Sequence, residues 1–255
     1  PDTLQAFLFA TINYNQKPVS KSLAYVLYGM SEYSKDPMKW PPDKLAVNIS
    51  RMLNQDISSP FQNKIYSTAQ DDKILEKYRK NEAWAVSTAT VVEGVMRLFT
   101  NNHKKDRAQM FKIKRSDKEP LSRNQLKKLG KNVPLRAVYM NGMDDKIYNA
   151  VHVYFSAALN ALDKSQYVTE TVKKTIGIQA LFDTLRIGIV CGVLTLDQLA
   201  NKSKMNEVLL PISKIDFSKE DLFPKASGIG RSNIRKAIGL ILKFENKVLG
   251  IKDAK

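Results

Sequence analysis

Four polar side chains near the start of the chain have the types and spacing to bind an anion. Asn13, Asn15, Gln16 and Lys17 lie in one short run between two apolar-periodic segments. Amides donate and accept hydrogen bonds at once, and donors beside a helix end can hold a phosphate or a base. The alternative is an ordinary helix–loop–helix connection in which the amides cap helix ends. In either case Ser20 is expected to be the N-cap of the second helix.

Positive charge is concentrated in two segments. The chain carries a net charge of +16 over its 255 residues. Residues 101–136 hold 12 basic and 3 acidic side chains, and residues 225–255 hold 8 and 2. The rest of the chain is almost neutral. A solvated surface normally spreads its charge, so this segregation favours a polyanion as partner, and we expect DNA.

The first basic segment supplies most of the expected DNA contacts. Lysines and arginines gathered in one stretch repel each other, and a phosphate backbone relieves that repulsion by releasing its counterions. We expect a polar turn over 101–107, a strand edge over 112–115 and a short basic helix over 121–129. The alternative is a solvated insertion. The expected contacts are Lys104, Lys105, Arg107, Lys112, Lys114, Arg115, Arg123, Lys127 and Lys128.

Near the start of the second basic segment, we expect a glycine turn at Gly228-Ile229-Gly230, ahead of a basic helix. Backbone N–H groups at such a turn can hold a phosphate, and the cations that follow would add charge. The turn also resembles the hairpin of helix-hairpin-helix DNA-binding motifs, although Ile234 stands where that motif prefers a small residue. The alternative is a flexible entry into a C-terminal helix. The expected DNA contacts here are Arg231, Arg235 and Lys236.

Residues for catalysis or metal binding are few. His103 and His152 are the only histidines, and the chain has no Cys/His metal spacing. We therefore expect no catalytic residue, no metal site and no cofactor within this chain. The single cysteine, Cys191, lies in an apolar stretch and fits a small hydrophobic side chain in a reducing cytoplasm. The acid pairs at 71–72 and 144–145 are expected at helix starts.

Apolar residues recur at helical spacing through most of the chain, which predicts a mainly α fold, an α+β chain with few short strands. A short strand is expected over 62–67, and Gly94 is expected to mark a close helix crossing. No apolar run approaches the ~20 residues that span a bilayer. Helices are expected over 4–12, 23–30, 45–53, 71–80, 88–99, 144–162, 168–190 and 195–199.

The change of composition predicts three parts. Residues 1–100 would form a first helical part, 101–136 a basic insertion, and 137–255 a helical domain with a basic tail. The chain begins at Pro1, without Met and without a signal segment, so we expect a fragment or a processed chain.

Several ordered blocks resemble one family. Residues 9–13, 15–19 and 22–23, then 51–54, 59–61 and 64–65, then 86–88, and finally 174–181 (KTIGIQAL) look like successive blocks of DGQHR-domain proteins. These include the DndB-type proteins of DNA phosphorothioation systems. The blocks cover about 9–181. The D-G-Q-H-R motif itself is absent, and in the family it lies upstream of the position where this chain begins.

The resemblance implies a fold and a function. The chain would be the C-terminal helical part of a protein whose upstream part has a ParB/sulfiredoxin-like α+β core, with residues 1–100 as the C-terminal part of the DGQHR-like core. It would be a cytoplasmic DNA-binding protein of a bacterial DNA-modification or phage-defence system, acting as a regulator or a modification partner, with other proteins of that system as further partners and no membrane association. The alternative is an NTP-hydrolysing enzyme whose motif lies upstream, with Asn13, Gln16 and Lys17 near the phosphates. A third possibility is an interaction scaffold.

Overall fold

The fold is mainly α. The computed structural model describes residues 20–30, 35–67, 84–111, 121–224 and 228–244. Of these residues 63% are helical, and the two described strands are short, which confirms the expected mainly α class. The elements are α2 (Lys21–Met30), η1 (Pro37–Lys39), α3 (Pro42–Gln55), β1 (Ile65–Tyr66), β2 (Val86–Ser87), α5 (Thr88–Phe99), α6 (His103–Met110), η2 (Arg123–Gln125), α7 (Arg136–Met140), α8 (Asp144–Asp163), α9 (Thr175–Val190), α10 (Leu196–Leu199), α11 (Lys202–Leu209), η3 (Leu210–Lys214) and α12 (Gly228–Ile241).

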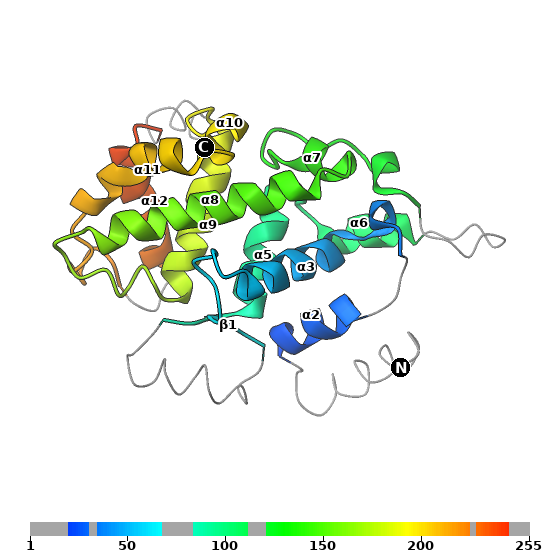
Figure 1. Ribbon diagram of the computed structural model, residues 1–255, viewed down its shortest axis with the longest axis horizontal. Coiled ribbons are helices and arrows are strands. Elements are labelled where there is room, and N and C mark those ends of the chain that lie inside the picture. The colour runs from blue at the N-terminus through cyan, green and yellow to red at the C-terminus, as the bar shows by residue number, and fades with distance from the viewer. Residues whose placement is uncertain (1–19, 31–34, 68–83, 112–120, 225–227, 245–255) are drawn as a thin grey trace, which may run out of the picture.

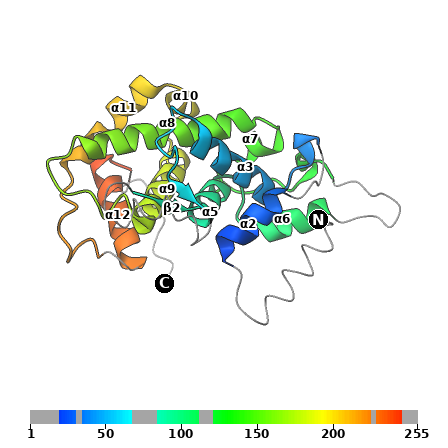
Figure 2. The same cartoon turned by 60° about the horizontal axis from the view of Figure 1, so that its bottom comes forward.

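The helices form a row beneath one long helix. In the row, α12 packs on α9, α9 on α5, α5 on α3, and α3 on α2. Figure 2 shows α12, α9 and α5 lying side by side beneath α8. The long helix α8 crosses over this row and also packs against α10, α11 and η3. Figure 2 shows α10 and α11 on the side of α8 opposite the row, and Figure 1 shows α8 running along the molecule. Most faces of α8 are therefore covered.

The sequence of α8 explains its central place. Twelve of its 20 residues are buried, including Tyr154 and Phe155. A helix that is apolar on most faces must be covered on most faces. One hydrophobic core runs from Tyr25 to Phe244 and crosses the expected boundaries at residues 100 and 136. The division into three parts stays a prediction.

Side-chain caps begin several helices where the sequence predicts them. Ser20 Oγ accepts a hydrogen bond from the Leu23 amide at 3.2 Å, at the start of α2. Ser87 Oγ does the same for the Thr90 amide at 3.3 Å. Thr195 forms a capping box with Gln198. The acids at 144–145 lie in the first turn of α8, as expected. Local capping chemistry thus fixes these helix starts.

The expected strand is confirmed in short form. Only Ile65 and Tyr66 are extended, and they pair in parallel with β2, with Ile65 opposite Val86. The expected helices over 4–12 and 71–80 lie outside the described residues, and so does the whole of the expected strand edge at 112–115.

Three local expectations are wrong. Residues 103–110, which include most of the expected turn, form α6 because the Asn102 side chain accepts from the Lys105 amide at 2.9 Å and caps the helix. The expected helix over 121–129 is reduced to the single turn η2. The expected helix over 168–190 begins only at Thr175. Before it the chain folds back, so that the backbone of Val172 lies against Gly177. A Cβ on Gly177 would be 2.1 Å from the Val172 carbonyl oxygen.

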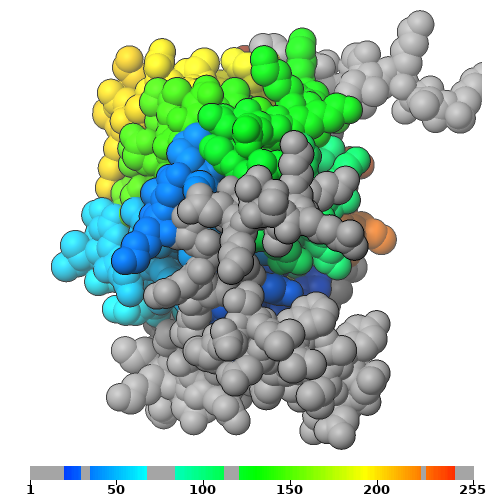
Figure 3. Space-filling model, turned by 90° about the vertical axis from the view of Figure 1, so that its right-hand side faces the viewer, coloured from blue at the N-terminus to red at the C-terminus, as the bar shows by residue number. Residues whose placement is uncertain are grey.

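The end of the molecule that holds η2 and α7 is tied to the segment before α3. Tyr139 Oη donates to the Trp40 carbonyl at 2.9 Å, and Ser122 Oγ donates to the Met38 carbonyl at 3.5 Å. Figure 3 views this end and shows the segment near residue 40 in blue beside the green η2–α7 segment. Part of the expected basic insertion is thus packed against the helical core.

None of the helices in the described part of the chain has the length and apolar character needed to cross a membrane.

Candidate nucleic-acid interface

A groove lined by four arginines lies between α5, α9 and α12. Its volume is about 610 Å³. Arg97 comes from α5, Arg186 from α9, and Arg231 and Arg235 from α12, while residues 100–101 and 132–133 close one side. We call this hollow the arginine groove. It joins residues that are as much as 138 positions apart in the sequence.

One carboxylate, Asp183, lies among these arginines. Arg231 Nε donates to one oxygen of Asp183 at 2.6 Å and Arg231 Nη2 to the other at 2.7 Å. Arg97 Nη1 reaches Asp183 at 3.5 Å. Arg186 Nη1 instead donates to the Asn132 carbonyl at 3.0 Å. Four guanidinium groups and one carboxylate leave the lining with an excess of positive charge, which suits an anion with several oxygens.

The crossing of α5 and α9 fixes two of the arginines. A Cβ on Gly94 would lie 2.3 Å from the Phe182 ring, so the two helices approach this closely only because residue 94 is glycine. The expectation for Gly94 is confirmed. Arg97 lies one helical turn after Gly94, and Asp183 follows Phe182. The crossing therefore places Arg97 opposite Asp183.

The start of α12 places the other two arginines. Arg231 and Arg235 are four residues apart and lie on one helix face. Gly230 packs against the Pro224 carbonyl oxygen, which would be 2.1 Å from a Cβ, and Asn233 Nδ2 donates to the Leu222 carbonyl at 2.8 Å. The expected glycine turn ahead of the helix is wrong: Gly228 and Gly230 are in the first turn of α12.

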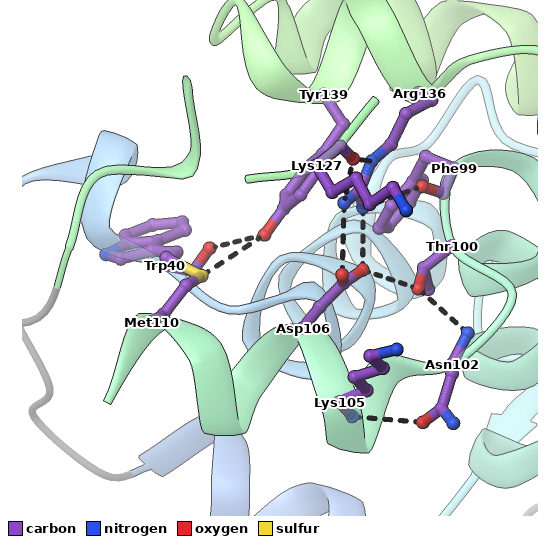
Figure 4. A network of polar contacts seen from close by, with 10 residues as sticks. All are labelled: Trp40, Phe99, Thr100, Asn102, Lys105, Asp106, Met110, Lys127, Arg136 and Tyr139. Atoms are coloured by element: carbon purple, nitrogen blue, oxygen red, sulfur yellow. Dashed lines mark hydrogen bonds and ion pairs between the residues drawn. The ribbon is translucent and has the colours of Figure 1, made fainter. Parts of the chain in front are cut away.

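A buried ion pair fixes the wall of the groove beside residues 100–101. Arg136 Nη1 and Nη2 donate to the two oxygens of Asp106 at 2.6 and 3.0 Å, and Arg136 also donates to the carbonyls of Phe99 and Lys127 (Figure 4). Thr100 Oγ1 donates to Asp106 at 2.6 Å. Both charged side chains are buried. The network joins the end of α5, helix α6 and the segment before α7.

The groove continues toward α6. Arg97, Thr100 and Asn101 also line a smaller hollow of about 200 Å³, which includes His103 at the start of α6. Burial lowers the pKa of His103, while nearby Asp43 opposes that shift. In the same hollow, burial raises the pKa of Tyr25 to about 12. The next residues of α6, Lys104 and Lys105, are exposed.

Apart from Arg123, the expected DNA contacts divide into four groups. Arg231 and Arg235 lie in the arginine groove. Five lysines are exposed outside its lining. Arg107 is half-buried, pairs with Asp43 and lies over the Tyr28 ring. The fourth group, Lys112, Lys114 and Arg115, lies outside the described residues, as do Asn13, Asn15, Gln16 and Lys17. The five exposed lysines are Lys104, Lys105, Lys127, Lys128 and Lys236.

The expectation that Arg123 contacts DNA is wrong. Its side chain is fully buried, and Nη2 pairs with Asp144 at 2.7 Å. Its guanidinium also lies 4.9 Å from the centre of the Tyr139 ring. The polar surroundings of Arg123 in the sequence gave no sign that the chain would fold over it.

Sequence reasoning missed Arg97 and Arg186. Each is the one basic residue of a largely apolar helix, so neither contributes to a run of basic residues. The available signal was a lone basic residue at a helix position that the apolar stripe leaves uncovered. That signal does not reveal that two such positions face each other.

His152 contributes to packing. Its Nε2 lies 3.2 Å from Ser58 Oγ, 3.1 Å from the Ser58 carbonyl and 3.9 Å from Asp56. A catalytic triad needs the carboxylate on the other ring nitrogen, so this serine, histidine and aspartate do not form one. Asp56 accepts hydrogen bonds from Tyr148 and from Ser58, which lower its pKa to about 2. The described residues contain no group of three or more His, Cys, Asp or Glu that could hold a metal ion.

Comparison of the chain with protein-family models, with curated proteins and with solved structures gave no match in any of the three.

Proposed function

We propose that this chain binds DNA through the phosphate backbone, with the arginine groove as the central contact. The observation that carries the proposal is the convergence of four arginines on one groove that contains a single carboxylate. One guanidinium group can bind two oxygens of the same phosphate at once, through two parallel hydrogen bonds. Binding that neutralises several phosphates also releases their counterions, which supplies sequence-independent affinity.

The exposed lysines support an extended contact. The groove leads past Asn101 to α6, where Lys104 and Lys105 are exposed. Lys127 and Lys128 are exposed in the segment that leads to Asn132, another residue of the groove lining. Lysine side chains outside a groove steer a polyanion toward it by long-range attraction. The described aromatic side chains do not line the groove, which favours backbone contacts over stacking on bases.

The finer parts of the proposal come from the resemblance described above. We propose that the protein acts in the cytoplasm as a DndB-like regulator or modification partner in a bacterial DNA-modification or phage-defence system. A ParB/sulfiredoxin-like core upstream of this chain, other proteins of that system as partners, and NTP bound by the full-length protein belong to the same proposal. Of these proposals, the arginine groove supports only the contact with DNA.

The test is a DNA titration of a charge-matched pair of variants. Arg186→Gln/Arg235→Gln removes two groove cations and leaves the Arg231–Asp183 pair in place. Lys204→Gln/Lys219→Gln removes two exposed cations outside the groove lining. We expect the groove variant to lose about tenfold or more in affinity for duplex DNA, and its slope of log K against log salt to flatten by about two. Fluorescence anisotropy at several KCl concentrations measures both quantities.

The control variant decides between a site and diffuse attraction. If binding depends on the groove, the lysine variant keeps nearly the affinity and slope of the unmodified chain. Equal losses in the two variants would mean that only net charge matters, and the groove would no longer be the contact. Matching thermal melts of the two variants are required, because a folding defect would lower affinity for another reason.

A further inference from the structure

A second basic pocket lies on another side of the fold. It is formed by the segment after α3, by α8, by the turn before α9 and by the start of α11, and its volume is about 270 Å³. Lys64, Lys173 and Lys202 line it together with one carboxylate, Asp163. We call it the lysine pocket. None of its lining residues belongs to the arginine groove.

Lys64 is held in this pocket by neutral groups. Its Nζ donates to the Pro60 carbonyl at 3.2 Å and lies 4.7 Å from the centre of the Trp84 ring. Within the part of the chain that the structure describes, it has no carboxylate at ion-pair distance. Burial lowers its pKa, and the neighbouring Lys173 adds to that shift while Asp163 opposes it. An anion in the pocket would stabilise the charged form of Lys64.

The other two lysines leave positive charge in the pocket. Lys173 Nζ pairs with Asp163 at 2.5 Å, and Lys202 is exposed at the first position of α11. Three ammonium groups against one carboxylate leave two positive charges in the lining. Like charges gathered in this way repel each other until an anion binds.

A buried hydroxyl in the same pocket has no hydrogen-bond partner. Ser156 lines the pocket, is 9% exposed, and its Oγ finds no partner among the described residues. A buried donor without an acceptor is destabilising, because the hydroxyl loses its hydrogen bonds to water. Ser156 Oγ exposes less than 1 Å² in this conformation, so an oxygen bound in the pocket would accept its proton once the side chain turns toward the pocket.

We propose that the lysine pocket binds the phosphate group of a small molecule, with Lys64, Lys173 and Lys202 as its cations and Ser156 as a neutral donor. Its volume is near the lower end of the ~300–1,000 Å³ range of ligand pockets, which suits a small phosphate compound and not a duplex. Free phosphate and the terminal phosphate of a nucleotide share this chemistry.

Protection of single lysines tests the proposal directly. The full chain is treated briefly with a limiting amount of an amine-acylating reagent, and each lysine is quantified by mass spectrometry. The chain is labelled in sodium chloride, in sodium phosphate of equal ionic strength, and in chloride with ADP or adenosine added. We expect millimolar phosphate or ADP to lower labelling of Lys64 and Lys173 several-fold and to leave Lys204, two residues after Lys202, unchanged.

The reagents separate the two sources of phosphate. Protection by inorganic phosphate identifies the free ion as sufficient, whereas protection by ADP alone shows that the organic part is needed; adenosine should protect nothing. The absence of protection by both phosphate and ADP would overturn the proposal. Equal protection of Lys204 would overturn it as well, because it would mark a general salt effect.

Two variants separate this site from the arginine groove. Ser156→Ala removes only an unpaired hydroxyl, so the fold should keep its stability while the phosphate concentration for half protection rises several-fold. Arg186→Gln/Arg235→Gln should leave protection of Lys64 unchanged, since the groove shares no residue with the pocket. Unaltered protection in Ser156→Ala would contradict the role of Ser156, and lost protection in the groove variant would place the phosphate site in the groove.

Discussion

Arg136 joins three parts of the chain through one buried guanidinium. It binds both oxygens of Asp106 on α6, the carbonyl of Phe99 at the end of α5, and the carbonyl of Lys127 before α7. A buried ion pair is worth little beyond an apolar pair of equal volume, but removal of one partner leaves a charge without compensation. Loss of Arg136 would therefore be costly because it would leave the Asp106 carboxylate buried without a cation.

We predict that Arg136→Met lowers the free energy of unfolding by about 3–5 kcal/mol, because Asp106 would stay buried without its cation. Urea denaturation followed by circular dichroism measures the change. Asp106→Asn/Arg136→Met serves as the control, since it also removes the stranded carboxylate, and it should recover part of the loss. A single variant as stable as the unmodified chain would show that the pair is not buried in solution.

At the scale of the elements, the sequence predicts helices well and their boundaries less well. Caps such as Ser87 and Thr195 are local, so they can be read directly from the sequence. The start of α9 at Thr175 depends instead on Val172 folding back against Gly177. Val172 stands at helical spacing from the apolar residues of α9 and is fully buried, but it lies in a turn before the helix and not in the helix itself. Spacing alone does not distinguish these two cases.

The candidate site shows the same division between local and distant information. Arg231 and Arg235 could be predicted because they stand in a basic segment. Arg97 and Arg186 could not, because their meeting depends on the crossing of α5 and α9. Gly94 pointed to that crossing, although its partner, Phe182, could not be named from the sequence.

We predict that Gly94→Ala destabilises the protein, because the added methyl group would overlap the buried Phe182 ring. Overpacking costs about 1–3 kcal/mol, against a gain of roughly 1 kcal/mol in helix propensity. Gly130→Ala is the matched control: a Cβ there meets no atom within 4 Å, so its effect should be small or slightly stabilising. Thermal melts of both variants give the comparison. Equal melting temperatures would show that the helices can move apart at no cost.

Across the whole molecule, arginines and lysines of the first basic segment occupy different places. Arg107, Arg123 and Arg136 pair with carboxylates on or beside the core, whereas the described lysines of the segment are exposed. Arginine is the more weakly hydrated cation and suits buried pairs. The net charge of the segment in the sequence therefore overstates the positive charge that is available to a partner, because three of its arginines already pair with carboxylates.

We predict that Lys104→Glu/Lys105→Glu weakens DNA binding and flattens its salt dependence, because α6 continues the line of the arginine groove. Lys204→Glu/Lys219→Glu makes the same change of net charge outside the groove lining and should have the smaller effect. Anisotropy titrations at several salt concentrations measure both. A smaller loss in the α6 variant than in the control would exclude α6 from the contact surface.

The Arg231–Asp183 ion pair sets a condition on any anion that would bind in the arginine groove: it must compete with Asp183 for Arg231. Asp183 already presents two oxygens to one guanidinium, in the arrangement that a phosphate would adopt. An incoming anion must therefore compete with a resident one. A spherical ion such as chloride offers no pair of oxygens, so it would compete poorly with Asp183 for Arg231. If the groove binds DNA as proposed, Asp183 would act as a competitor that favours oxyanions able to engage several arginines together.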